Sequence, residues 1–287
     1  WGLVTIGLGI TWILTSVGAY FLTPLNARLA ALAGAILVVT GPTVIGPLLR
    51  HMHLKGESGS VLKFEGIVND PIGAVLAIIT FQVIQAGPLD QAIHIAAIGV
   101  IRSASVATVL GLAGAALLTF VLHRGLLPPY LRATGSAAVV LVVHSLSDLV
   151  QPESGLLAVT IMGTALASQP FVSTHDFRRR HEDLQVGLVS VLFIVLVARI
   201  PLDNITDLGW GALAWVALLI FIVRPLAAFT STAGSDLDWK ERTLIAGIAP
   251  RGVVAAAVSS VFALKLADSN LPGHELLLPL NFTVVAV

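Results

Sequence analysis

The sequence contains no cysteine and carries little charge. The absence of cysteine excludes disulfides, thiolate metal sites and cysteine nucleophiles. Charged residues make up 11% of the 287 residues, and 16 basic side chains balance 16 acidic ones. A soluble domain carries about 25% charged residues, so the deficit argues against a soluble protein. With no basic tail or patch, we expect no nucleic-acid partner.

Apolar residues are abundant instead, at 56% of the chain, and the mean hydropathy is +0.93. Both values are typical of a membrane protein. We predict an all-α polytopic membrane protein with one transmembrane domain over residues 1–287. Because the chain begins and ends inside apolar segments without a start methionine, we expect it to be a fragment. Runs near the roughly 20 residues needed to cross a bilayer predict about ten spans, near 3–22, 29–49, 62–85, 95–122, 133–150, 155–169, 185–200, 209–229, 243–266 and 276–287.

The loops between these spans alternate in charge. Lysine and arginine occur in the loops at 50–63, 123–132, 170–184 and 230–242, and are absent from those at 86–94, 151–154, 201–208 and 267–275. Such alternation is what the positive-inside rule requires if every span crosses once. Only Arg28 departs from it. We therefore assign the basic loops to the cytoplasm and expect a multi-pass protein of the plasma membrane.

Two acids interrupt the otherwise apolar span 62–85. Glu65 and Asn69 are four residues apart and share a helix face, while Asp70 lies about 100° further round. A carboxylate inside a bilayer costs about 2.5–3.5 kcal/mol even on lenient scales. One interpretation is a helix end whose acids reach the headgroups. We favour the other, an ion or proton site.

Arg224 is a candidate partner for Glu65. At about 1.5 Å per residue, Glu65 lies about 4–5 Å and Arg224 about 7–8 Å from the cytoplasmic ends of their spans. A buried pair at this depth would satisfy both charges and fix the packing of two helices. The alternative is that Arg224 reaches to the membrane surface, as long basic side chains near helix ends commonly do.

Two spans contain glycine and proline near the middle of the membrane. The first reads Val39-Thr40-Gly41-Pro42-Thr43 and the second Gly247-Ile248-Ala249-Pro250-Arg251-Gly252. Proline frees backbone groups, which lipid tolerates only where they line a cavity or find new partners. The two spans run in opposite directions, so the pattern indicates an inverted-repeat transporter with a site at the midplane. Proline kinks without function remain the alternative.

No catalytic or cofactor pattern competes with this interpretation. His144, Ser147 and Asp148 are residue types of a hydrolytic triad, but they lie almost consecutively near a helix end, where relay geometry is poor. No metal-ligand spacing occurs either. We expect neither enzymatic activity nor a cofactor.

The run Glu65-Gly-Ile-Val-Asn69-Asp70, together with Thr40-Gly41-Pro42, Arg224 and Arg251-Gly252, resembles the monovalent cation:proton antiporter-1 family, the NhaP-type Na⁺/H⁺ antiporters. The resemblance covers essentially the whole chain. It implies a thirteen-helix transporter of which this fragment would hold helices four to thirteen. It also implies two crossing broken helices in a bundle that rocks against a part through which two copies form a homodimer.

By that resemblance, Asp70 is the carboxylate that binds a monovalent cation or protons alternately. Asn69 orients the site, Glu65 pairs with Arg224, and Thr40 joins Asn69 in a hard oxygen shell suited to Na⁺, K⁺ or Li⁺. The unwound crossing would comprise six residues, which are Thr40, Gly41, Pro42, Pro250, Arg251 and Gly252.

Two residues depart from the family pattern. The first break usually reads Thr-Asp-Pro, and Gly41 stands in place of the acid; Gly66 follows the motif glutamate where serine is common. These changes leave the choice between Na⁺ and K⁺ open. The function we expect is exchange of a monovalent cation, foremost Na⁺, for protons by alternating access. The alternative is a cation channel that uses the same site without coupling.

Overall fold

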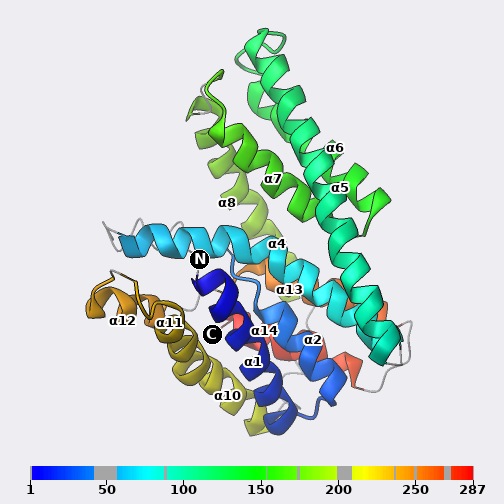
Figure 1. Cartoon of the computed structure of the whole chain (residues 1–287), viewed down its shortest axis with the longest axis vertical. Helices are drawn as coiled ribbons and strands as arrows, with labels where there is room; N and C mark the ends of the chain where they lie inside the picture. The colour runs from blue at the N-terminus through cyan, green and yellow to red at the C-terminus, as the bar shows by residue number, and fades with distance from the viewer. Residues whose placement is uncertain are drawn as a thin grey trace. The chain divides into compact units, whose positions relative to one another are not determined.

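The computed structural model describes residues 2–41, 57–86, 89–152, 154–172, 175–198, 209–235, 237–248, 251–267 and 273–286 (Figure 1). Within these ranges the chain is helical and forms no strand. It divides into two compact units, one of Trp1–Phe81 with Val191–Val287 and one of Gln82–Ser190, and each is described by itself.

The first unit contains the two interrupted helices. Its elements are η1 (Leu3–Gly7), α1 (Leu8–Leu22), α2 (Ala27–Leu37), most of α4 (Glu57–Ala86), α10 (Gly209–Leu218), η2 (Leu219–Val223), α11 (Arg224–Ser231), α12 (Trp239–Gly247), α13 (Val253–Ala267), η3 (His274–Leu276) and α14 (Leu277–Ala286). The second unit is made of α5 (Leu89–His123), α6 (Arg132–Val150), α7 (Ser154–Ser168) and most of α8 (His175–Ala198).

The all-α fold class predicted from the sequence is confirmed, since the described residues form helices and no strand. Five helical stretches in the described part of the chain are long and apolar enough to cross a membrane: Leu3–Leu22, Ser58–Gln85, Ala97–His123, Arg132–Val150 and Gly209–Ser231. Shorter apolar helices cover Ala27–Leu37, Ser154–Ser168 and Val254–Leu266. The number of crossings therefore stays a prediction.

Helix α2 lies at the centre of the first unit, where it contacts α1, α13 and α14. Almost all of it from Leu29 onward is buried, because apolar residues and glycine occupy every face. Two tryptophans join its neighbours: Trp12 Nε1 donates to the Ala31 carbonyl of α2, and Trp215 Nε1 donates to the Thr15 carbonyl of α1, each at 3.1 Å. Each indole thus satisfies its polar atom; the Trp215 ring is fully buried and the Trp12 ring partly buried.

Both interrupted helices begin with a cap and end within the unit. Asn26 caps α2, which ends at Leu37 and is followed by non-helical residues up to Gly41. A capping box of Asp238 and Glu241 begins α12, which ends at Gly247; α13 resumes at Val253. Pro42, Thr43, Ala249 and Pro250, which the sequence places in the two breaks, lie outside the described residues.

The span that carries Arg224 is a single stretch of helix with a wide turn in it. A π-helical turn, Leu219–Val223, joins α10 to α11 immediately before Arg224 and Pro225. Because Pro225 has no N–H to donate to the preceding turn, a locally widened helix accommodates it without an unfilled bond. This π-helical turn, which lies just before Arg224, affects the direction in which the Arg224 side chain points away from the helix.

The second unit packs through small residues. Helix α5 contacts both α6 and α7 (Figure 1). A Cβ on Gly114 would lie 2.6 Å from Val143 of α6 and 3.1 Å from Met162 of α7. Such glycines allow helix backbones to approach closely, which stabilises packing in lipid, where no hydrophobic driving force operates.

Candidate functional site

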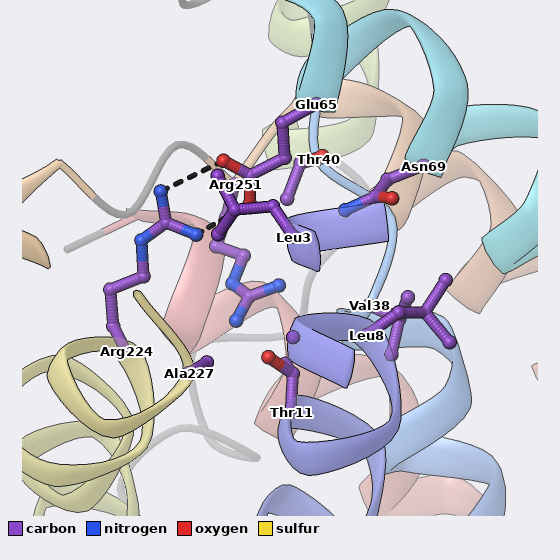
Figure 2. A pocket seen from close by; sticks show the side chains of 11 residues that line it. Leu3, Leu8, Thr11, Val38, Thr40, Glu65, Asn69, Arg224, Ala227 and Arg251 are labelled. Atoms are coloured by element: carbon purple, nitrogen blue, oxygen red, sulfur yellow. Dashed lines mark hydrogen bonds and ion pairs between the residues drawn. The ribbon is translucent and has the colours of Figure 1, made fainter. Parts of the chain in front are cut away.

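The structure brings Glu65 of α4 and Arg224 of α11 together. Arg224 donates from Nη2 to Glu65 Oε2 over 3.0 Å and from Nη1 to Oε1, so the contact is bidentate (Figure 2). The two side chains are only 3% and 5% exposed. Parallel charged bonds of this kind are both strong and geometrically specific, and they need such geometry to offset the desolvation of two charges.

Arg224 makes a third hydrogen bond, to the second break. Its Nε donates to the Ile248 carbonyl over 2.8 Å. Ile248 is the residue at which α12 leaves the helical conformation, and the last carbonyls of a helix have no partner within it. Arg224 therefore joins three elements, α4, α11 and the end of α12, through one guanidinium group.

A small cavity lies beside this pair. Thr40 from the first break, Asn69 from α4, Arg251 from the second break and Thr11 from α1 line it together with Glu65 and Arg224 (Figure 2). Its volume is about 10 Å³, close to the least that one water molecule needs. Polar groups from both interrupted helices and from the acidic helix thus meet in one place.

Several buried polar atoms at this place have no hydrogen-bond partner among the described residues. They are Thr40 Oγ1, Asn69 Oδ1 and Arg251 Nη1. A buried polar atom left unsatisfied costs about 1–3 kcal/mol, so each calls for an explanation. Two of the three are oxygen atoms, the ligand type that Na⁺ and K⁺ bind.

Asp70 is placed differently from the rest of the predicted site. It does not line the cavity, although Asn69 beside it does. The separation follows from the helix, on which consecutive side chains point about 100° apart. Its Oδ1 is nevertheless buried without a partner in the described part of the chain. The structure thus places Glu65, Asn69 and Thr40 around one cavity and leaves Asp70 on an adjacent face of α4.

Gly73 marks where the first break approaches α4. A Cβ built on Gly73 would lie 2.7 Å from Val39 Cγ2 and 3.0 Å from the Val39 backbone nitrogen. Real Cβ atoms essentially never come as close as the first of these distances. The glycine is therefore what lets the residue before Thr40 contact the helix that carries Asn69.

Of the remaining predicted residues, Arg251 lines the cavity and Gly41 and Gly252 are buried. Pro42 and Pro250 lie outside the described residues. The sequence interpretation gave no site role to Thr11, Ile248 or Gly73. Ile248 was named only as part of the predicted second break, and Gly73 lies one helical turn beyond Asn69 in the motif-bearing span, whereas Thr11 left no signal.

Non-helical residues after α2 and between α12 and α13, beside a buried Glu65–Arg224 pair in an apolar all-helical fold, are typical of membrane transporters of the inverted-repeat class. The family model "Sodium/hydrogen exchanger, transmembrane" matches residues 2–287. The chain belongs to this family, as the motif resemblance indicated. It is a family of transporters rather than enzymes, and its members are multi-pass membrane proteins.

Similar proteins include a K(+)/H(+) antiporter NhaP2 of Shewanella sp. (strain ANA-3), 27% identical over 99% of this chain and 49% of that protein. Na(+)/H(+) antiporter 1 of Methanocaldococcus jannaschii is 26% identical over 85% of this chain and 58% of that protein. The chain thus spans about half the length of the curated relatives it matches. The solved structure of the sodium proton antiporter MjNhaP1 from M. jannaschii at pH 8 matches with a TM-score of 0.81 and 22% identity, covering 99% of this chain and 75% of that one. It shares the fold.

Proposed function

We propose that the protein containing this chain exchanges a monovalent cation for protons by alternating access. The observation that carries the proposal is the set of buried oxygens without partners at the first break and on α4: Thr40 Oγ1, Asn69 Oδ1 and Asp70 Oδ1. Similar proteins are named as K(+)/H(+) and Na(+)/H(+) antiporters, which supports the same reaction.

Coupling would arise at Asp70. A single carboxylate that holds either a cation or a proton cannot hold both, so loading one releases the other. Asn69 and Thr40 would add hard oxygen ligands of the kind that alkali cations accept. Glu65 would not exchange ions, because both its oxygens are already bound by Arg224. Its role would be to hold α4 against α11 and the second break.

The wider arrangement follows from the family and the loop charges. The bundle containing both breaks would rock relative to a dimerising part of the protein, exposing Asp70 to each side in turn. We infer a homodimer in the plasma membrane, with the basic loops 50–63, 123–132, 170–184 and 230–242 in the cytoplasm. Monovalent cations, protons and the bilayer would be its partners.

The test uses full-length protein in liposomes that are loaded with acid and a trapped pH dye. Adding Na⁺, K⁺ or Li⁺ outside should drive protons out of wild-type vesicles and name the ion. Asp70→Asn should abolish this flux. Asp238→Asn is the matched control. Asp238 caps the start of α12, distant in the sequence from Asp70, and asparagine caps a helix about as well as aspartate.

Two results would contradict the proposal. Wild-type exchange rates in Asp70→Asn would remove Asp70 from the reaction. Silence of the wild type with all three cations would refute cation/proton exchange. A channel would reveal itself by single-channel currents that move no protons.

A further inference from the structure

The contact between Gly73 and Val39 brings α4 close to the first break. Gly73 lies four residues after Asn69, so both share one face of the helix. Val39 is fully buried and immediately precedes Thr40, which is 4% exposed. The contact therefore adjoins Thr40 and Asn69, the two cavity-lining residues whose oxygens have no partner among the described residues.

There is no spare room at this contact. A methyl group on Gly73 would meet Val39 at three atoms, Cγ2 at 2.7 Å, the backbone nitrogen at 3.0 Å and Cα at 3.2 Å. Rotating the valine side chain could relieve only the first of these. The other two belong to the backbone, so the chain before Thr40 or α4 itself would have to move by a few tenths of an ångström.

Such a movement would change the distance between Thr40 and Asn69. Both line the same cavity, Thr40 from the break and Asn69 from α4. A cation that uses oxygens from both sides is sensitive to their separation, because alkali cations differ in size and in the ligand distance they prefer. A closer approach of the two backbones would favour the smaller cation, and a wider separation the larger one.

We propose that Gly73 is a positioning residue that sets the cation preference of the exchanger by fixing how closely the first break approaches α4. The inference rests on the proposed function and deepens it. Gly73 touches no ion itself; it acts through Val39 on Thr40. Widening the contact should move the preference toward K⁺, and loosening it on the valine side should move the preference toward Na⁺.

The experiment measures the apparent KM for Na⁺ and for K⁺ in proteoliposomes of the full-length protein. In Gly73→Ala the ratio KM(Na⁺)/KM(K⁺) should rise about three- to tenfold, since displacements well under 1 Å change binding by such factors. Adding Val39→Ala to that variant removes only the Cγ2 contact, the closest of the three, and should bring the ratio part of the way back toward the wild type. Gly163→Ala is the control, because a Cβ on this helical glycine meets no atom within 4 Å.

A purely structural role would lower the maximal rate with both cations and leave the ratio unchanged, and that result would overturn the inference. Should Gly73→Ala be too unstable to purify, Val39→Ala alone decides: its ratio should fall about two- to threefold, by the same dependence on position. An unchanged ratio would overturn the inference. Wild-type protein without any cation-dependent proton flux would instead refute the proposed function, which separates the two failures.

Discussion

After α2 the chain passes through Val38, Val39, Thr40 and Gly41, none of which carries a charge, whereas the second break contains Arg251 and begins beside Arg224. At the second break, Arg224 fixes the Ile248 carbonyl through a hydrogen bond of 2.8 Å and is itself fixed by Glu65. At the first break, the visible restraint is steric, Val39 against Gly73.

The two breaks thus differ in role: charged hydrogen bonds anchor the second, whereas the first leaves an oxygen atom free, among the described residues, to act as a ligand. At the second break the carbonyl of Ile248, at the end of α12, is already bound by a guanidinium group. At the first break packing holds the backbone and leaves the Thr40 hydroxyl without a partner among the described residues. The charged contact of Arg224 with Glu65 and the Ile248 carbonyl is strong, but the polar groups that form it are already bound to one another. A steric contact consumes none, so the oxygens beside it stay available to an ion.

The strongest test of the Glu65–Arg224 pair is to remove its carboxylate. Glu65→Ala leaves Arg224 buried without a counter-charge, and breaking a buried pair in this way costs about 3–5 kcal/mol. We expect a large fall in the thermal unfolding temperature of the purified protein in detergent. The second break should loosen with it, because Arg224 loses the group that orients it toward Ile248.

The matched control for this variant is Glu275→Ala, which removes an exposed carboxylate from the same unit. Its unfolding temperature should stay near that of the wild type, since exposed charges contribute little. Equal unfolding temperatures of the two variants would show that the Glu65–Arg224 pair stabilises the protein no more than a surface charge does.

Much of this arrangement could be predicted from the sequence, because the bilayer imposes simple rules. Length and hydropathy predicted where helices would lie, and loop charge predicted their direction across the membrane. The predicted direction turned residue number into depth, which placed Glu65 and Arg224 at a similar level and made their pairing a hypothesis; in the structure Arg224 donates to Glu65. Glycine and proline located the breaks.

The rest depends on which surfaces meet, and depth carries no information on that. Nothing in the sequence pairs the Arg224 side chain with the Ile248 backbone, since every residue offers the same carbonyl. The closeness of Gly73 to Val39 likewise requires the crossing of two helices to be known. The resemblance assigned Asp70 and Asn69 to one site, and only the structure shows that Asn69 lines the cavity whereas Asp70, about 100° round the helix, does not.

A smaller effect is expected at the first break from Thr40→Val, which keeps the shape of the side chain and removes the hydroxyl. Since Thr40 Oγ1 binds no described residue, stability should be unchanged or slightly higher. If the hydroxyl is a ligand, the apparent cation affinity should fall about tenfold, the equivalent of about one charged hydrogen bond. The measurement is the KM of cation-driven proton efflux.

Thr15→Val serves as its control. Thr15 is also fully buried, and its Oγ1 also has no partner in the described part of the chain, but it does not line the cavity. Its KM should equal that of the wild type. If both variants changed affinity alike, the hydroxyl at Thr40 would have no special place among buried threonines, and the first break would lose its assigned role as a ligand source.

The smallest effects concern the helix starts, where the two interrupted helices are alike. Asn26 Oδ1 accepts from Leu29 N over 2.9 Å at the start of α2, and Asp238 forms a capping box with Glu241 at the start of α12. Asn26→Ala and Asp238→Ala should each cost about 1 kcal/mol in thermal unfolding, while Asp238→Asn should cost almost nothing. If the two cap variants lose similar unfolding free energy while variants at the two breaks do not, the two helices differ at their breaks and not at their starts. If Asp238→Ala alone cost more than about 3 kcal/mol, outside the usual range for a cap, the difference between the two helices would extend along the whole of α12.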